Sequence, residues 1–334
     1  MRFRKLIISA AFACAFLLVF VAHSQESTQF EILTPQSLLN LKQSAEQGDV
    51  KAQFELGRRH SLGDGLPEND VEAVKWYRLA AEQGYAQAQF FLGIMHSLGD
   101  GVRQNDTKAI DWYRLAAEQG YLDAQTTLAL EFYRKDDVEA AKWWRLAAEQ
   151  GDATAQTNLG LALRYGQGVP ENDSDAVEWY LLAAQQNQPT AQFALADMYD
   201  SGEGVTMDIE EAAKWYRLSA EQGHARAQLR LGLKLDQGHG VPRNMEEAAN
   251  WYRLSAEQGT IGAQIRLGIM YALGEGVDQN NIKAYSWLSI AASQGDADAR
   301  ELKSELEKRM NRDQLEEAQM LSSKCFESEY KDCD

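Results

Sequence analysis

Hydrophobic residues recur along this chain in two alternating helical patterns. In the first pattern an alanine is followed four residues later by a leucine, so that both lie on one face of a helix. The pattern occurs seven times, at Ala52/Leu56, Ala88/Leu92, Ala124/Leu128, Ala155/Leu159, Ala191/Leu195, Ala227/Leu231 and Ala263/Leu267. In the second pattern a tryptophan follows an alanine by three residues, at Trp76, Trp112, Trp143, Trp179, Trp215, Trp251 and Trp287. The alternation that strands require is missing, so these patterns predict two helices per unit.

Start and stop signals separate the helices. An Asn or Asp that can accept backbone N–H groups precedes the second helix, at Asn69, Asn105, Asn172, Asp208 and Asn244. Glu-Gln-Gly or a close variant follows it and ends at Gly48, Gly84, Gly120, Gly151, Asn187, Gly223, Gly259 and Gly295. A glycine at that place closes a helix in the left-handed conformation. Between the two helices lies a Gly-x-Gly turn, which the third unit lacks.

The closing triplets are spaced at a fixed period. Their spacing is 36 residues, except for one interval of 31 where the turn is missing. A repeat of this length predicts a solenoid, because no single helix pair can bury its apolar face without a neighbour. The sequence therefore predicts one elongated all-α domain of seven antiparallel helix pairs, capped by helices at both ends.

Two details of the repeat predict close helix packing. The residue after each leucine is glycine or alanine, although glycine inside a helix costs about 1 kcal/mol relative to alanine. Only a close contact with another helix explains that restriction.

The tryptophan column admits two interpretations, a stacking platform for sugars or bases and a packed core. Its recurrence beside alanines in every unit favours the core, with Trp179 in the middle of the array.

The chain ends differ from the repeats. Residues 1–24 have the form of a signal peptide, because three basic residues precede an uncharged apolar run and small residues occupy a cleavage site at Ala22 and Ser24. An uncleaved membrane anchor is the alternative. Residues 25–47 are predicted to form a linker and an N-terminal capping helix that starts at Thr34-Pro35. Residues 48–295 form the seven repeats, and residues 296–334 form C-terminal capping helices and a tail.

The charge and the composition of the chain limit the kinds of partner and chemistry that we expect. The net charge of −17 becomes −20 when the three basic residues of the signal segment are removed. Such an acidic body repels phosphate backbones, which argues against nucleic-acid binding, and it contacts a membrane only if the signal segment stays uncleaved. The usual catalytic signatures are missing from the sequence, and no cofactor or metal is predicted. His60 and His96 stand at equivalent positions at the end of a first helix, where packing explains them.

Two cysteines remain after the signal segment, Cys325 and Cys333. In an oxidising compartment an even count allows one disulfide across a short C-terminal loop. The alternative, a free thiol pair or a metal site, lacks helper residues, since no histidine follows His239.

The 36-residue unit, with its Ala-x-x-Leu-Gly, Gly-x-Gly-Val, Ala-x-x-Trp-Tyr and Ala-Glu-Gln-Gly motifs, resembles the Sel1-like repeat family, relatives of the tetratricopeptide repeats. The resemblance covers Gly48 to Gly295. It implies a right-handed superhelix whose members act as adaptors in signalling, envelope assembly and host interaction. Some secreted relatives have a disulfide in every repeat and are associated with β-lactam binding or hydrolysis. No repeat here contains a cysteine, so that activity does not carry over.

The most variable positions of the repeat predict a binding surface. By analogy with tetratricopeptide arrays, a stripe along the first helices lines the concave face. In one unit this stripe offers the apolar pair Phe91 and Met95. In the sixth and seventh units it offers the basic residues Arg226, Arg230, Lys234 and Arg266. We expect an acidic peptide segment at the basic residues and a second anchor at the apolar pair; an ordinary solvated face is the alternative.

These observations predict an exported, non-catalytic scaffold that binds a protein or peptide, in the periplasm or outside the cell. One alternative is a secreted enzyme acting on cell-wall or β-lactam substrates. Another is a secreted host-interaction factor with the same fold.

Overall fold

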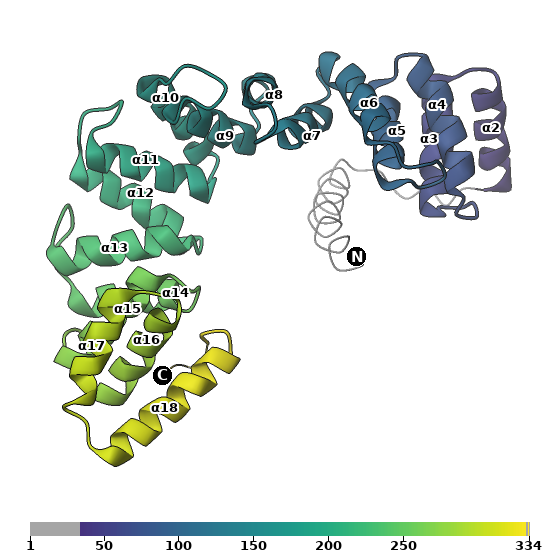
Figure 1. Ribbon diagram of the computed structural model, residues 1–334. Helices are drawn as coiled ribbons and strands as arrows, with labels where there is room; N and C mark the ends of the chain where they lie inside the picture. Colours follow the sequence, from purple (N-terminus) through teal and green to yellow (C-terminus); the bar gives the residue numbers. More distant parts are fainter. Residues whose placement is uncertain (1–33, 332, 334) are drawn as a thin grey trace. The chain divides into compact units, whose positions relative to one another are not determined.

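The computed structural model describes residues 34–331 and 333, which form helices with no strand among them (Figure 1). The predicted signal segment, residues 1–24, and most of the linker lie outside these residues. The described chain divides into two compact units, one ending at Tyr121 and one starting at Leu122. The prediction of an all-α solenoid is confirmed.

The helices alternate between the two types that the sequence predicts. The first helices of the seven repeats are α3 (Val50–Leu62), α5 (Ala86–Leu98), α7 (Leu122–Phe132), α9 (Ala153–Arg164), α11 (Pro189–Ser201), α13 (Ala225–Gln237) and α15 (Ile261–Leu273). The second helices are α4 (Asp70–Glu82), α6 (Asp106–Glu118), α8 (Asp137–Glu149), α10 (Asp173–Gln185), α12 (Ile209–Glu221), α14 (Met245–Ala256) and α16 (Asn281–Ser293). Before them lies α2 (Pro35–Glu46), and after them α17 (Ala297–Glu307) and α18 (Arg312–Glu327).

The helix ends follow the predicted signals. The side chain of Asn172, for example, accepts the N–H of Asp175 at 3.2 Å and so satisfies a donor in the first turn of α10. The corresponding Asn or Asp caps the second helix of every repeat. At the other end of α10, Asn187 takes the left-handed conformation that glycine has elsewhere, with φ 62°. Local sequence therefore sets where each helix begins and ends.

The two helices of a repeat meet through a glycine and an aromatic ring. A Cβ atom on Gly160 of α9 would lie 2.6 Å from Cε1 of Tyr180 on α10. This confirms that close helix packing restricts the residue after the leucine. The ring in the contact belongs to Tyr180, which is fully buried, whereas Trp179 is only half-buried. The prediction that the tryptophan column forms the core thus holds for Trp143 and Trp287, each 1% exposed, whereas Trp179 is only partly buried. Consecutive helical residues point in directions about 100° apart, and here the tyrosine points inward.

The turns stack from repeat to repeat. Gly168, the second glycine of a Gly-x-Gly turn, has φ 71° and lies over the backbone carbonyl of Asp137 in the preceding repeat. A Cβ atom there would lie 1.9 Å from that carbonyl oxygen, so only glycine fits. The turn thus packs against the first residue of α8.

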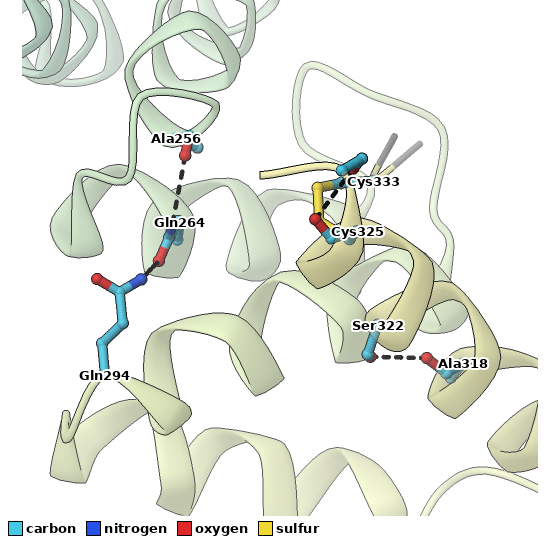
Figure 2. Close-up of a disulfide and its surroundings, with 8 residues drawn as sticks. Ala256, Gln264, Gln294, Ala318, Ser322, Cys325 and Cys333 are labelled. Carbon is cyan, nitrogen blue, oxygen red and sulfur yellow. Dashed lines mark hydrogen bonds between the residues drawn. A yellow bond between two sulfur atoms is a disulfide. The ribbon is translucent and has the colours of Figure 1, made fainter. Parts of the chain in front are cut away.

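A buried glutamine joins neighbouring repeats. Gln264 on α15 donates its side-chain N–H to the carbonyl of Ala256 at 3.2 Å and accepts a hydrogen bond from Gln294 at 2.8 Å (Figure 2). Equivalent pairs of bonds are made by Gln53, Gln89, Gln156, Gln192 and Gln228. Since these amides are buried and bonded at both the nitrogen and the oxygen, they fix the register between one helix pair and the next.

The C-terminal helices close the array. Helix α18 starts with the predicted capping box, in which Asn311 and Gln314 bond each other's backbone N–H groups. It packs against α16, together with α17 (Figure 1). Ile290 on α16 is fully buried as a result, whereas Leu254, at the same position of the preceding repeat, is exposed.

Candidate functional site

The predicted basic residues lie on two neighbouring first helices. His224 caps α13, where its Nδ1 accepts the N–H of Ala227 at 3.2 Å. This start places Arg226, Arg230 and Lys234 at intervals of one helical turn on one stripe. Arg266 occupies on α15 the position that Arg230 occupies on α13. The structure therefore brings the predicted cations to one surface of the unit that starts at Leu122.

Three aspartates, which the sequence analysis did not connect with these cations, lie beside them. Arg230 Nε lies 3.9 Å from Asp197 Oδ1, and Arg266 Nη1 lies 3.9 Å from Asp236 Oδ2. Lys234 Nζ forms an ion pair with Asp200, and its side chain is only 12% exposed. The cluster is thus a mixed array of both charges, and Lys234 is already occupied. The expectation that Lys234 is free for a ligand needs this correction.

Two of the aspartates are held by tyrosines from the core. The hydroxyl of Tyr216 donates to Asp197 Oδ1 at 2.5 Å, and the hydroxyl of Tyr252 donates to Asp236 Oδ2 at 3.3 Å. Burial raises the pKa of both hydroxyls, and the adjacent carboxylate raises it further, so both stay protonated and donate. Each carboxylate therefore has a closer partner than the arginine beside it.

The arginines keep much of their surface. The side chain of Arg230 is 51% exposed and that of Arg266 is 46% exposed. Arg226 is exposed and forms no ion pair with any residue that the structure describes. Arg226 thus has no ion-pair partner among the described residues, and Arg230 and Arg266 each form a long ion pair of 3.9 Å.

The predicted apolar anchor is not a surface patch. Met95 is 5% exposed and belongs to the core of the first unit. Phe91 is half-buried, and its ring packs 5.6 Å from those of Phe54 and Tyr77. Both residues point into the contact between the first two repeats, which the variable-column argument did not anticipate. The pair also lies in a different unit from the arginines, so the structure assembles no common site from them.

The tail cysteines are joined. A disulfide links Cys325, near the end of α18, to Cys333, and their Cα atoms are 4.5 Å apart (Figure 2). Both residues are buried, and Tyr330 lies against the turn that follows α14, where a Cβ on Gly259 would lie 3.4 Å from its ring. The bridge holds the tail against the body of the last repeats.

Groups typical of metal binding do not gather in the described part of the chain. No group of three His, Cys, Asp or Glu side chains there is arranged to hold a metal ion. His96 is buried, as the packing interpretation expects. None of the helices between residues 34 and 331 combines the length and the apolar character needed to cross a membrane.

The stacked helix pairs define an α-solenoid, a class of protein that presents one helix of each repeat to a ligand. The chain belongs to the Sel1 repeat family. The Sel1 repeat model matches residues 50–85, 86–121, 128–152, 153–188, 189–224, 225–260 and 261–296. This confirms the resemblance and the number of repeats.

Two solved structures are similar to this chain. A Sel1 repeat protein from Oxalobacter formigenes is 35% identical, with a TM-score of 0.64 over 83% of each chain. A protective antigen of uropathogenic Escherichia coli with an SLR fold is 28% identical, with a TM-score of 0.49 over 89% of this chain and 88% of that one. The sequence has no match among curated proteins.

Proposed function

We propose that this chain is a non-catalytic scaffold that binds an acidic peptide segment of a partner protein. Sel1 repeat proteins commonly serve as protein-interaction scaffolds, which supports binding as the general role. The binding surface is the stripe formed by Arg226, Arg230 and Arg266, called here the arginine stripe.

The observation that carries the proposal is the exposure of Arg230 and Arg266 and their weak pairing with aspartates. They occupy the same position in consecutive repeats, each about half exposed and each 3.9 Å from a carboxylate that a tyrosine already binds. The aspartates keep the two guanidinium groups in place, and the long ion pairs are easily exchanged for a ligand carboxylate. Lys234 has a structural role because its ion pair with Asp200 is largely buried.

The test uses a fluorescein-labelled oligoglutamate peptide and fluorescence anisotropy. We expect the full mature chain to bind this peptide, with an affinity that falls as salt is added. Reversing Arg226, Arg230 and Arg266 to Glu should remove binding while circular dichroism stays unchanged.

A matched control variant separates the loss of the arginine stripe from the change in the net charge of the protein. Reversing Lys75, Lys142 and Lys214 changes the total charge equally, on exposed positions of second helices. We expect this control to retain most of the affinity. Equal loss in both triple variants, or no binding by the native chain, contradicts the arginine stripe.

We also propose that the protein is exported to the periplasm or beyond the cell. Residues 1–24 support this by their signal-like pattern, and the linked cysteines fit an oxidising compartment. N-terminal sequencing of the protein from cell fractions tests the proposal. A start near Gln25 in the periplasm or medium is expected, whereas a chain retained in the membrane with Met1 intact indicates the anchor instead.

A further inference from the structure

A cavity of about 170 Å³ lies between α8 and α9, in the unit that starts at Leu122. Its lining includes Trp144 of α8, Asn158 and Ala162 of α9, and two tyrosines, Tyr133 and Tyr165. None of these residues belongs to the arginine stripe. The cavity nevertheless adjoins the same first-helix column, since Asn158 stands two repeats before Arg230.

One small residue accounts for the cavity. Ala162 occupies a position that is Met95, Met198 and Met270 in other repeats, and all three of those methionines are buried. A long side chain fills the space between the second helix of one repeat and the first helix of the next. Alanine at residue 162, which lines the cavity, is too short to fill that space.

Three aromatic side chains line the cavity, together with small apolar residues, two amides and one carboxylate, that of Asp137. Trp144 is buried, while Tyr133 and Tyr165 are 44% and 57% exposed. The nearest charges already have partners: the carboxylate of Asp137 accepts the backbone N–H of Arg134 at 3.0 Å, and Arg164 binds Glu203 at 2.7 Å. A charged ligand therefore gains little here, whereas an aromatic ring gains contact with three others.

We propose that this cavity, called here the Ala162 pocket, takes one aromatic side chain of the bound peptide. Cavities of about 150 Å³ lined by apolar groups hold a benzene ring, so the volume fits one phenyl group. Ring–ring contacts add about 0.5–1.5 kcal/mol beyond burial, which favours an aromatic over an aliphatic anchor. The amides of Asn158 and Gln167 add hydrogen-bonding groups for the peptide backbone.

This inference rests on the proposed function, because it names a second anchor of the same partner. Asn158 and Arg230 occupy the same repeat position two repeats apart, so a peptide that runs along the first helices can reach both. We therefore expect the partner to carry an aromatic residue near an acidic segment.

The experiment uses ¹⁹F NMR with N-acetyl-4-fluorophenylalanine amide as the probe and the full mature chain. We expect broadening and a shift of the probe signal with the native chain. Ala162→Met should abolish both, because it fills the pocket with the side chain that other repeats have there. Tyr165→Ala, on an exposed wall, should weaken binding by about two- to tenfold.

Circular dichroism and thermal melting verify that Ala162→Met and Tyr165→Ala fold. For Ala162→Met we expect this because other repeats have methionine at the same position. The chain with all three arginines of the stripe reversed should still bind the probe, which separates failure of the pocket from failure of the arginine stripe. An unchanged probe signal with the native chain overturns the inference. Retained binding by Ala162→Met does so too, as does equal competition by N-acetyl-leucine amide.

Discussion

Gly160 on α9 and Tyr180 on α10 lie in such close contact that a Cβ atom on the glycine would come within 2.6 Å of the tyrosine ring. The same pairing joins Gly57 to Tyr77, Gly93 to Tyr113 and Gly232 to Tyr252. It determines how closely the two helices of a repeat approach each other. The contact therefore offers a direct test of what holds a repeat together.

We expect Gly160→Ala to destabilise the protein, because overpacking costs about 1–3 kcal/mol and outweighs the gain of about 1 kcal/mol in helix propensity. In a Tyr180→Ala background the same change should instead be stabilising, since the ring is gone. Urea denaturation of the four chains of this double-mutant cycle measures the coupling. A destabilisation by Gly160→Ala of equal size in both backgrounds contradicts the contact.

The buried tyrosine hydroxyls should respond differently to removal. Tyr180 Oη is buried without a hydrogen-bond partner among the described residues, whereas Tyr216 Oη donates to Asp197. Tyr180→Phe should be neutral or stabilising, and Tyr216→Phe should cost about 1–3 kcal/mol. Denaturation midpoints of the two variants check this, each being the control for the other. The opposite order of stabilities would show that the Asp197 bond is not retained in solution.

His96 predicts a dependence of stability on pH. Burial lowers the pKa of its imidazole below the ordinary value, and Lys108 and Arg78 lower it further. As pH falls through about 6.5, the unfolded chain takes up a proton that the folded chain refuses, so the free energy of unfolding decreases. The contribution of the neutral His96 to the free energy of unfolding is lost progressively as the pH falls from about 6.5 to the pKa of the folded state.

The matched variant is His96→Leu, since Leu163 and Leu235 occupy the equivalent position in other repeats. Its free energy of unfolding should fall less than that of the native chain between about pH 7 and pH 5. Parallel pH profiles of the two proteins would remove His96 as the cause.

The disulfide should stabilise only the C-terminal end. Closing a loop of this length stabilises the folded state by about 2–3 kcal/mol, and a solenoid transmits such effects weakly along its length. In a Cys325→Ser/Cys333→Ser chain, we expect faster amide hydrogen exchange in α18 and the tail. Exchange in α9 to α12 should match that of the native chain. Uniformly faster exchange would mean that the bridge supports the whole array.

Local signals explain why the fold could be predicted so fully. Capping residues such as Asn172, closing residues such as Gly151 and the alanine–leucine pairs all act within a few positions of the chain. The choice between Trp179 and Tyr180 could not be made in this way, because both recur at the same period. Which of them is buried depends on which side chain points toward Gly160 on the facing helix.

The contacts of the candidate site could not be predicted from one helix alone, because they are made with residues of neighbouring helices. Arg230 and Lys234 share a stripe on α13, but their counter-charges come from Asp197 and Asp200 on another helix. Met95 belongs to the variable column and yet is buried, because its neighbours on α4 cover it. The Ala162 pocket was likewise missed, although comparing that column for side-chain volume rather than for charge would have revealed it.

The glutamine bonds between repeats have a consequence for how such a chain changes in length. Gln192 bonds Ala184 of the repeat before it and Gln222 of its own repeat, and Gln228 makes the same two bonds one repeat later. Excising residues 189–224 would bring Gln228 opposite Ala184, a partner identical to the one it lost. Unequal recombination that removes this 36-residue unit therefore preserves the glutamine bonds, but it puts Arg164 where Asp200 now pairs with Lys234, so the repeats can be exchanged in their backbone register and not in their surface charges.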